Sequence, residues 1–114
     1  MQLTVDPEPH RFEIAVVTAS TPTVSMTVRG DIDLATAPLL LSALLDAIES
    51  NTPRVLELDL TGMTFLDARG VSALLQAYLA AAAIDCRVRL VRPPGHIRRV
   101  LDITGVSSVC ELVD

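Results

Sequence analysis

Hydrophobic and polar residues alternate along several short stretches of the chain, a pattern typical of strands with one buried face. Residues 12–17 alternate weakly, and residues 23–29 alternate cleanly. The turn signal at residues 20–22 lies between them, so these two strands are predicted to form a hairpin. Three further strands are predicted at residues 55–60, 87–91 and 109–113.

Three other segments repeat apolar residues at helical spacing. The first helix is predicted to begin just after Thr36. Thr36 or its neighbour is expected to be the N-cap, with Pro38 in the first turn. The second is predicted over residues 68–83 with Asp67 as its N-cap. The third opens at residues 93–95. The expected core positions of the second helix are Val71, Leu74, Leu75, Tyr78, Leu79 and Ala82.

The segments between these elements are predicted to be irregular. Gly30 is expected to end the second strand, and residues 31–36 are expected to form a loop. Residues 61–66 are interpreted as a turn at Gly62 followed by an apolar bridge. Residues 1–10 are predicted to be a flexible N-terminal tail, and residues 11–114 a single domain.

The order β-β-α-β-α-β-α-β predicts an α/β fold with a small mixed sheet, in which an N-terminal hairpin is followed by right-handed βαβ crossovers. Three strands carry polar residues on their second face, whereas a sheet covered on both faces has strands that are apolar throughout. We therefore expect the helices mainly on one face. On the other face, Glu57 and Asp59 are expected to pair with Arg87 and Arg89.

The amino-acid composition argues against several kinds of partner and active site. The net charge of −5 argues against nucleic acid or an anionic membrane surface as a partner. All nine basic residues are arginines, which excludes a Schiff-base or P-loop lysine. The longest uncharged run, residues 70–84, is too short to span a bilayer, so no membrane insertion is expected. Cys86 and Cys110 show no metal-site spacing, and a cytoplasmic protein with reduced thiols is the expectation.

One motif has an enzymatic character. Asp31 and Asp33 follow a strand and resemble the paired aspartates of haloacid-dehalogenase-type phosphatases, which bind Mg²⁺ and form an aspartyl phosphate. The chain is short for that fold, and it lacks both a lysine and a second acidic cluster. A Mg²⁺-dependent phosphatase is therefore kept only as a remote alternative to a polar loop, and we expect no enzyme and no cofactor.

The start of the second helix is the least ordinary feature of the chain. Arg69 is expected in the first turn, where a cation is unfavourable by roughly 0.3–1 kcal/mol, and the helix then carries no charge from Gly70 to Ile84. A set of small or uncharged residues is expected to face outward and suits close contact with another protein: Ser72, Ala73, Gln76, Ala80 and Ala83. The alternative is that an alanine-rich helix is simply a stable helix.

Three runs of the chain together resemble the STAS domain family of anti-sigma factor antagonists. They are residues 30–38 (GDIDLATAP), residues 58–67 (LDLTGMTFLD) followed by Gly70, and residues 92–101 (RPPGHIRRVL) followed by Thr104 and Gly105. The resemblance implies a small sheet with helices on one side. It also implies partner switching: the antagonist binds a serine-kinase anti-sigma factor until that kinase phosphorylates a serine or threonine at the start of the second helix.

This sequence departs from the family at the acceptor position, which is occupied by Arg69, with Ala68 beside it. Neither side chain is a substrate for a serine kinase. The resemblance thus implies an antagonist independent of phosphorylation at the usual site. The alternative is a stand-alone STAS subunit of a transporter or stressosome-like complex, and a homodimer is left open. The partner-binding residues are expected to be Asp31, Asp33, Thr36, Asp67, Ala68, Arg69, Gly70, Ser72, Ala73 and Gln76.

Overall fold

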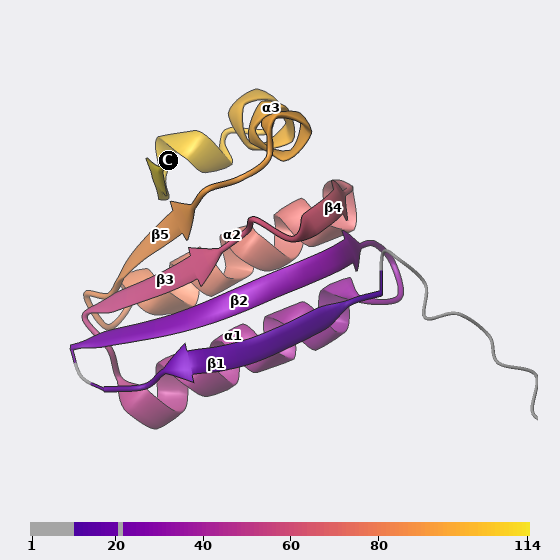
Figure 1. Ribbon diagram of the computed structural model, residues 1–114. Coiled ribbons are helices and arrows are strands. Elements are labelled where there is room, and N and C mark those ends of the chain that lie inside the picture. Colours follow the sequence, from indigo (N-terminus) through magenta and orange to yellow (C-terminus); the bar gives the residue numbers. More distant parts are fainter. Residues whose placement is uncertain (1–10, 21) are drawn as a thin grey trace, which may run out of the picture.

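The structure is a computed structural model that describes residues 11–20 and 22–114, so the predicted tail at residues 1–10 lies outside the described residues. Figure 1 shows a mixed sheet and three α-helices. The strands are β1 (Glu13–Thr18), β2 (Thr23–Ile32), β3 (Val55–Asp59), β4 (Met63–Leu66), β5 (Arg87–Val91) and β6 (Glu111–Val113). The helices are α1 (Ala37–Asn51), α2 (Ala68–Ala82), α3 (Gly95–Ile103) and the 3₁₀ helix η1 (Val106–Ser108).

The strand order β1-β2-β3-β5-β6 confirms the predicted hairpin and crossovers. Strand β1 runs antiparallel to β2, whereas the pairs β2–β3, β3–β5 and β5–β6 are parallel. The parallel neighbours in this path are joined through α1, through β4 and α2, and through α3 and η1, as parallel pairing requires.

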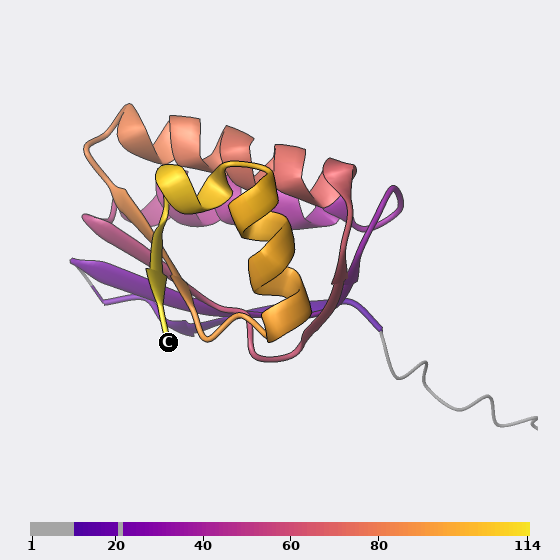
Figure 2. The ribbon, with the colours of Figure 1, turned by 90° about the horizontal axis from the view of Figure 1, so that it is seen from above.

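The helices lie mainly on one face of the sheet, as the alternating strands predicted. Helices α1 and α2 lie side by side over that face, and α3 lies beyond strand β5, where it packs against β4 and η1 (Figures 1 and 2). The core is almost entirely aliphatic, with Val24, Leu40, Leu58 and Leu90 fully buried. Within the described part of the chain, no helix is long and apolar enough to cross a membrane.

Strand β4 was not predicted, and β2 is longer than predicted. The strand β2 continues past Gly30 and stays paired. Gly30 adopts a φ of 90°, which glycine tolerates readily. Its N–H donates to the Gly62 carbonyl at 2.9 Å, and β4 then pairs in parallel with the last residues of β2. The segment interpreted as a turn and an apolar bridge is therefore a turn and a four-residue strand. Asp31 belongs to β2, not to a loop.

The buried side of α2 is rotated from the predicted one. Leu79 is 65% exposed and Ala82 is also exposed, although both were expected in the core. The buried alanines of this helix, spaced four residues apart, are Ala73, Ala77 and Ala81. Residues at this spacing share one helix face, and α2 packs against α1. The prediction built the core face mainly from large apolar residues, with Ala82 as its one alanine, and so missed this alanine stripe.

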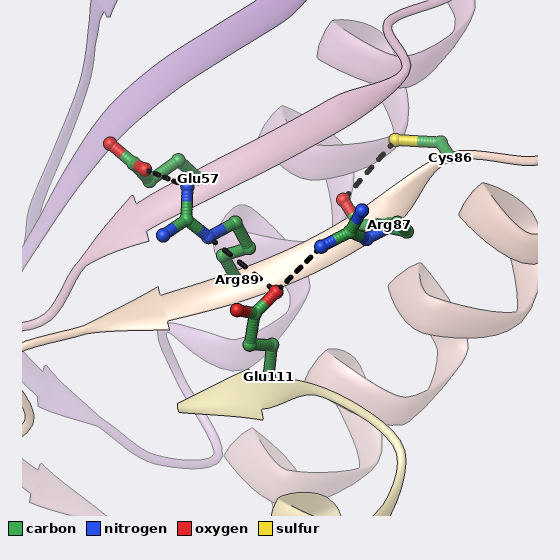
Figure 3. Close-up of polar contacts among 5 residues, drawn as sticks. All are labelled: Glu57, Cys86, Arg87, Arg89 and Glu111. Carbon is green, nitrogen blue, oxygen red and sulfur yellow. Dashed lines mark hydrogen bonds and ion pairs between the residues drawn. The ribbon is translucent and has the colours of Figure 1, made fainter. Parts of the chain in front are cut away.

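The polar face of the sheet carries a row of ion pairs (Figure 3). Arg89 Nη1 lies 3.1 Å from Glu57 Oε2, which confirms one predicted pair. Arg87 Nη2 instead lies 3.0 Å from Glu111 Oε1, and Arg89 Nε lies 3.6 Å from the same oxygen. Such partly exposed pairs contribute about 0.2–1 kcal/mol each.

Asp59 does not pair with a β5 arginine as predicted, because the β3–β5 register places Val91 opposite it. Its Oδ2 lies 2.7 Å from Arg92 Nη2, and its Oδ1 accepts hydrogen bonds from the backbone and hydroxyl of Thr61. Partial burial acts to raise the pKa of Asp59, but the Thr61 hydrogen bonds and the Arg92 guanidinium outweigh it and hold that pKa below its usual value.

Candidate functional site

The start of α2 is fixed by Asp67, as the sequence predicted. The Asp67 Oδ1 atom accepts hydrogen bonds from the backbone N–H groups of Arg69 at 2.9 Å and Gly70 at 3.2 Å. Asp67 itself has an extended backbone, and its N–H donates to the Ile32 carbonyl at the end of β2. A carboxylate at this position satisfies free N–H groups and suits the positive end of the helix.

Gly70 explains why the helix tip approaches the sheet so closely. A Cβ atom at this position would lie 2.4 Å from Leu66 Cδ1 and 2.7 Å from Ile32 Cγ2. Ile32 and Leu66 are both buried, so moving either side chain away would disturb its own packing. The glycine therefore allows the first turn of α2 to pack directly on the ends of β2 and β4.

Ala68 and Arg69 are the exposed residues of this tip. Among the residues that the structure describes, no carboxylate lies within the 4.0 Å ion-pair distance of the Arg69 guanidinium, whereas five other arginines form such pairs. Arg69 is also in the first helical turn, where the dipole disfavours a cation. The side chain thus makes no ion pair that explains its place in the fold.

The loop between β2 and α1 is held by its own polar side chains. Asp33 Oδ1 accepts hydrogen bonds from the backbone N–H groups of Ala35 and Thr36 at 3.0 and 3.1 Å. Thr36 or its neighbour was expected to cap α1; Thr36 is the N-cap residue, but its hydroxyl forms no cap hydrogen bond. The hydroxyl instead donates to the Asp31 carbonyl at 2.7 Å and accepts from the Asp33 N–H. The Thr36 side chain therefore closes the loop, although Thr36 holds the N-cap position of α1.

The carboxylate of Asp31 is used at a different place from that of Asp33. Asp31 Oδ1 accepts a hydrogen bond from the Thr64 hydroxyl at 2.6 Å and so ties β2 to β4. In residues 11–20 and 22–114, no group of three or more His, Cys, Asp or Glu side chains is arranged to hold a metal ion. The structure gives the phosphatase alternative no supporting feature, because each aspartate serves a local structural contact.

A groove between α1 and α2 joins part of the predicted partner-binding set to residues that were not predicted. It encloses about 340 Å³. Arg69, Ser72, Ala73 and Gln76 line it from α2, and the residues that line it from α1 and the preceding loop are Leu34, Ala37, Pro38 and Leu41. The remaining predicted residues lie outside its lining, at the end of β2, in the loop that follows and at the helix tip: Asp31, Asp33, Thr36, Asp67, Ala68 and Gly70.

Ala73 was expected to face outward, and that expectation is wrong. Its side chain is 2% exposed and forms part of the groove wall in the contact between the two helices. Ser72 and Gln76 are exposed as expected, and Gln76 Nε2 donates to Ser72 Oγ at 3.1 Å. The signal missed in the sequence is the α1 side, where Pro38 and Leu41 are three residues apart in the helix and Leu34 comes from the loop before it.

The STAS domain family model matches residues 14–114, and the chain belongs to that family. No curated protein matches the chain. Its fold is also that of solved anti-sigma factor antagonists. One such antagonist, from Mycobacterium paratuberculosis, is 26% identical over 92% of this chain and 87% of that chain, with a TM-score of 0.78.

Two solved structures of SpoIIAA share the fold at lower identity. The unphosphorylated anti-sigma factor antagonist SpoIIAA is 20% identical, with a TM-score of 0.74 over 91% of this chain and 89% of that chain. The phosphorylated form of SpoIIAA, a Bacillus cell fate determinant, is also 20% identical, with a TM-score of 0.67 over 91% of this chain and 92% of that chain.

Proposed function

We propose that this protein is an anti-sigma factor antagonist that binds a serine-kinase anti-sigma factor in bacterial partner switching and is not released by phosphorylation at the usual site. The observation that carries the proposal is the exposed Arg69 at the Asp67-capped start of α2. In the family that the chain belongs to, this position holds the phosphorylated serine or threonine. The anti-sigma factor antagonist from Mycobacterium paratuberculosis, which shares the fold at 26% identity, supports the same class of partner.

An arginine in place of the phosphorylated residue changes the charge of the contact surface. Phosphorylation adds about −1.5 to −2 charges to the contact surface of a family member and so repels the partner. Arginine accepts no phosphate from a serine kinase, and its guanidinium stays positive at any physiological pH. The contact surface at position 69 therefore keeps one fixed charge, and the kinase activity of the partner has no acceptor there on which to act.

The experiment that tests the proposal has two stages. Tagged protein is immobilised, exposed to lysate of its source organism, and the bound proteins are identified by mass spectrometry. The protein is then added to the complex of the captured anti-sigma factor with its sigma factor. Release of the sigma factor is the expected result. Capture of transporter or large-complex subunits without an anti-sigma factor, or a sigma complex that is unaffected, would contradict the proposal.

A further inference from the structure

The residues that line the groove between α1 and α2 indicate which kind of side chain binds there. Membership of the family alone does not indicate this. Its floor is apolar, since Ala37 and Ala73 are 5% and 2% exposed and leave space between the two helices. Leu34 stands at its edge with 63% of its surface exposed. A large exposed apolar residue beside an apolar groove marks a surface that another molecule covers.

The charge at the groove is the second observation. Arg69 is the only charged residue in its lining, and no described carboxylate lies within 4.0 Å of the guanidinium. The nearest acid along the chain, Asp67, directs its Oδ1 to backbone N–H groups. The other polar lining residues, Ser72 and Gln76, are neutral and bonded to each other. The groove therefore presents one unpaired cation in a protein of net charge −5.

We infer that the groove receives one large apolar side chain of the partner, with an aspartate or glutamate of the same partner segment placed against Arg69. This inference rests on the proposed function for the identity of the partner. Charge complementarity carries it: the one charged residue in the groove lining is the cation Arg69, which attracts a carboxylate. A small-molecule site would have polar groups that converge from several sides, whereas all those of the groove lie on α2.

The chemistry of the groove can be tested without the partner. The probe is 3-phenylpropanoate, which carries an apolar ring and a carboxylate, and its control is the neutral 3-phenylpropanamide. Both are titrated into ¹⁵N-labelled protein, and the backbone amide shifts are followed by NMR. We expect binding of the carboxylate in the millimolar range, with the largest shifts at Leu34, Arg69, Ala73 and Gln76, and binding of the amide several-fold weaker.

Two pairs of variants separate charge from shape. Arg69→Gln should abolish the preference for the carboxylate probe, whereas Arg99→Gln, which removes an exposed arginine of α3, should leave it unchanged. Ser72→Phe should fill the groove and abolish binding of both probes, whereas Ala82→Phe, at an exposed position ten residues further along α2, should not. Equal binding of both probes to wild type, or no shifts at the groove, would overturn the inference.

The captured partner supplies an independent test. Arg69→Glu should weaken its binding by about tenfold or more, because like charges then meet at the contact. Each acidic residue of the partner is replaced by arginine, and one of these changes should restore binding to Arg69→Glu. If the partner is an anti-sigma factor but no reversal rescues binding, this inference fails and the proposed function stands. If no anti-sigma factor is captured, the proposed function fails, and the probe titration still decides the chemistry of the groove.

Discussion

Replacing Gly70 by alanine tests whether close contact fixes the start of α2. The added Cβ would lie 2.7 Å from Ile32 Cγ2 and 3.1 Å from Ile32 Cβ. Rotation of the Ile32 side chain moves its Cγ2 atom but not its Cβ atom, so backbone must shift. Leu66 Cδ1, at 2.4 Å, is the end of a flexible but buried side chain. The contact with Ile32 is therefore the harder one to relieve.

The magnitude follows from two opposing terms. Overpacking of a filled core is unfavourable by about 1–3 kcal/mol, and the higher helix propensity of alanine returns up to about 1 kcal/mol. We expect Gly70→Ala to lower the free energy of unfolding by about 1–2 kcal/mol. For a domain of this size, each kcal/mol lowers Tm by about 4 °C.

The assay is urea unfolding followed by circular dichroism, with Gly95→Ala as the matched control. Gly95 is the first residue of α3, and a Cβ there meets no atom within 4 Å. That variant should be neutral or slightly more stable, because alanine reduces the freedom of the unfolded chain. If Gly70→Ala were as stable as Gly95→Ala, close packing at the helix tip would not be what requires glycine.

Three further predictions concern the helix cap Asp67, the carboxylate of Asp59 and the two buried thiols. Asp67→Ala should lower the free energy of unfolding by about 1 kcal/mol, and Asp67→Asn, which keeps a capping oxygen, by much less. Asp59→Asn should be less stable than wild type near neutral pH, because the effect of burial is outweighed by the Thr61 hydrogen bonds and the Arg92 guanidinium, which lower the folded pKa of Asp59. Urea unfolding at a series of pH values should show this difference vanish as the pH falls through that pKa, below 3.8. Burial raises the pKa of Cys110 to about 11 and also raises that of Cys86. Iodoacetamide should therefore label both thiols in urea but neither in the native protein at neutral pH, and rapid native labelling would contradict their burial.

The features that the sequence predicted well are those set by local chemistry. Asp67 caps α2 because a carboxylate before an apolar helix has free N–H groups within reach. The alternation of β3 and β5 predicted a polar sheet face because strand side chains alternate. These inferences needed only neighbours along the chain, and the structure confirms both.

The features that were missed depend on contacts between distant segments. Strand β4 has four residues, too few for a periodic signal, and exists because β2 continues past Gly30 to pair with it. The inward direction of Ala73 depends on where α1 lies, which the composition of α2 alone does not reveal. The groove was missed for the same reason, since half of its lining comes from α1 and the loop before it.

We propose that Arg69 removes the phosphorylation step from an otherwise ordinary antagonist. The most direct measurement incubates the captured kinase-type partner with Mg²⁺-ATP and either wild type or Arg69→Ser, and follows intact mass and complex dissociation together. We expect that Arg69→Ser gains one phosphate and dissociates, whereas wild type gains none and stays bound. Phosphorylation and release of wild type at the rate of Arg69→Ser would contradict it.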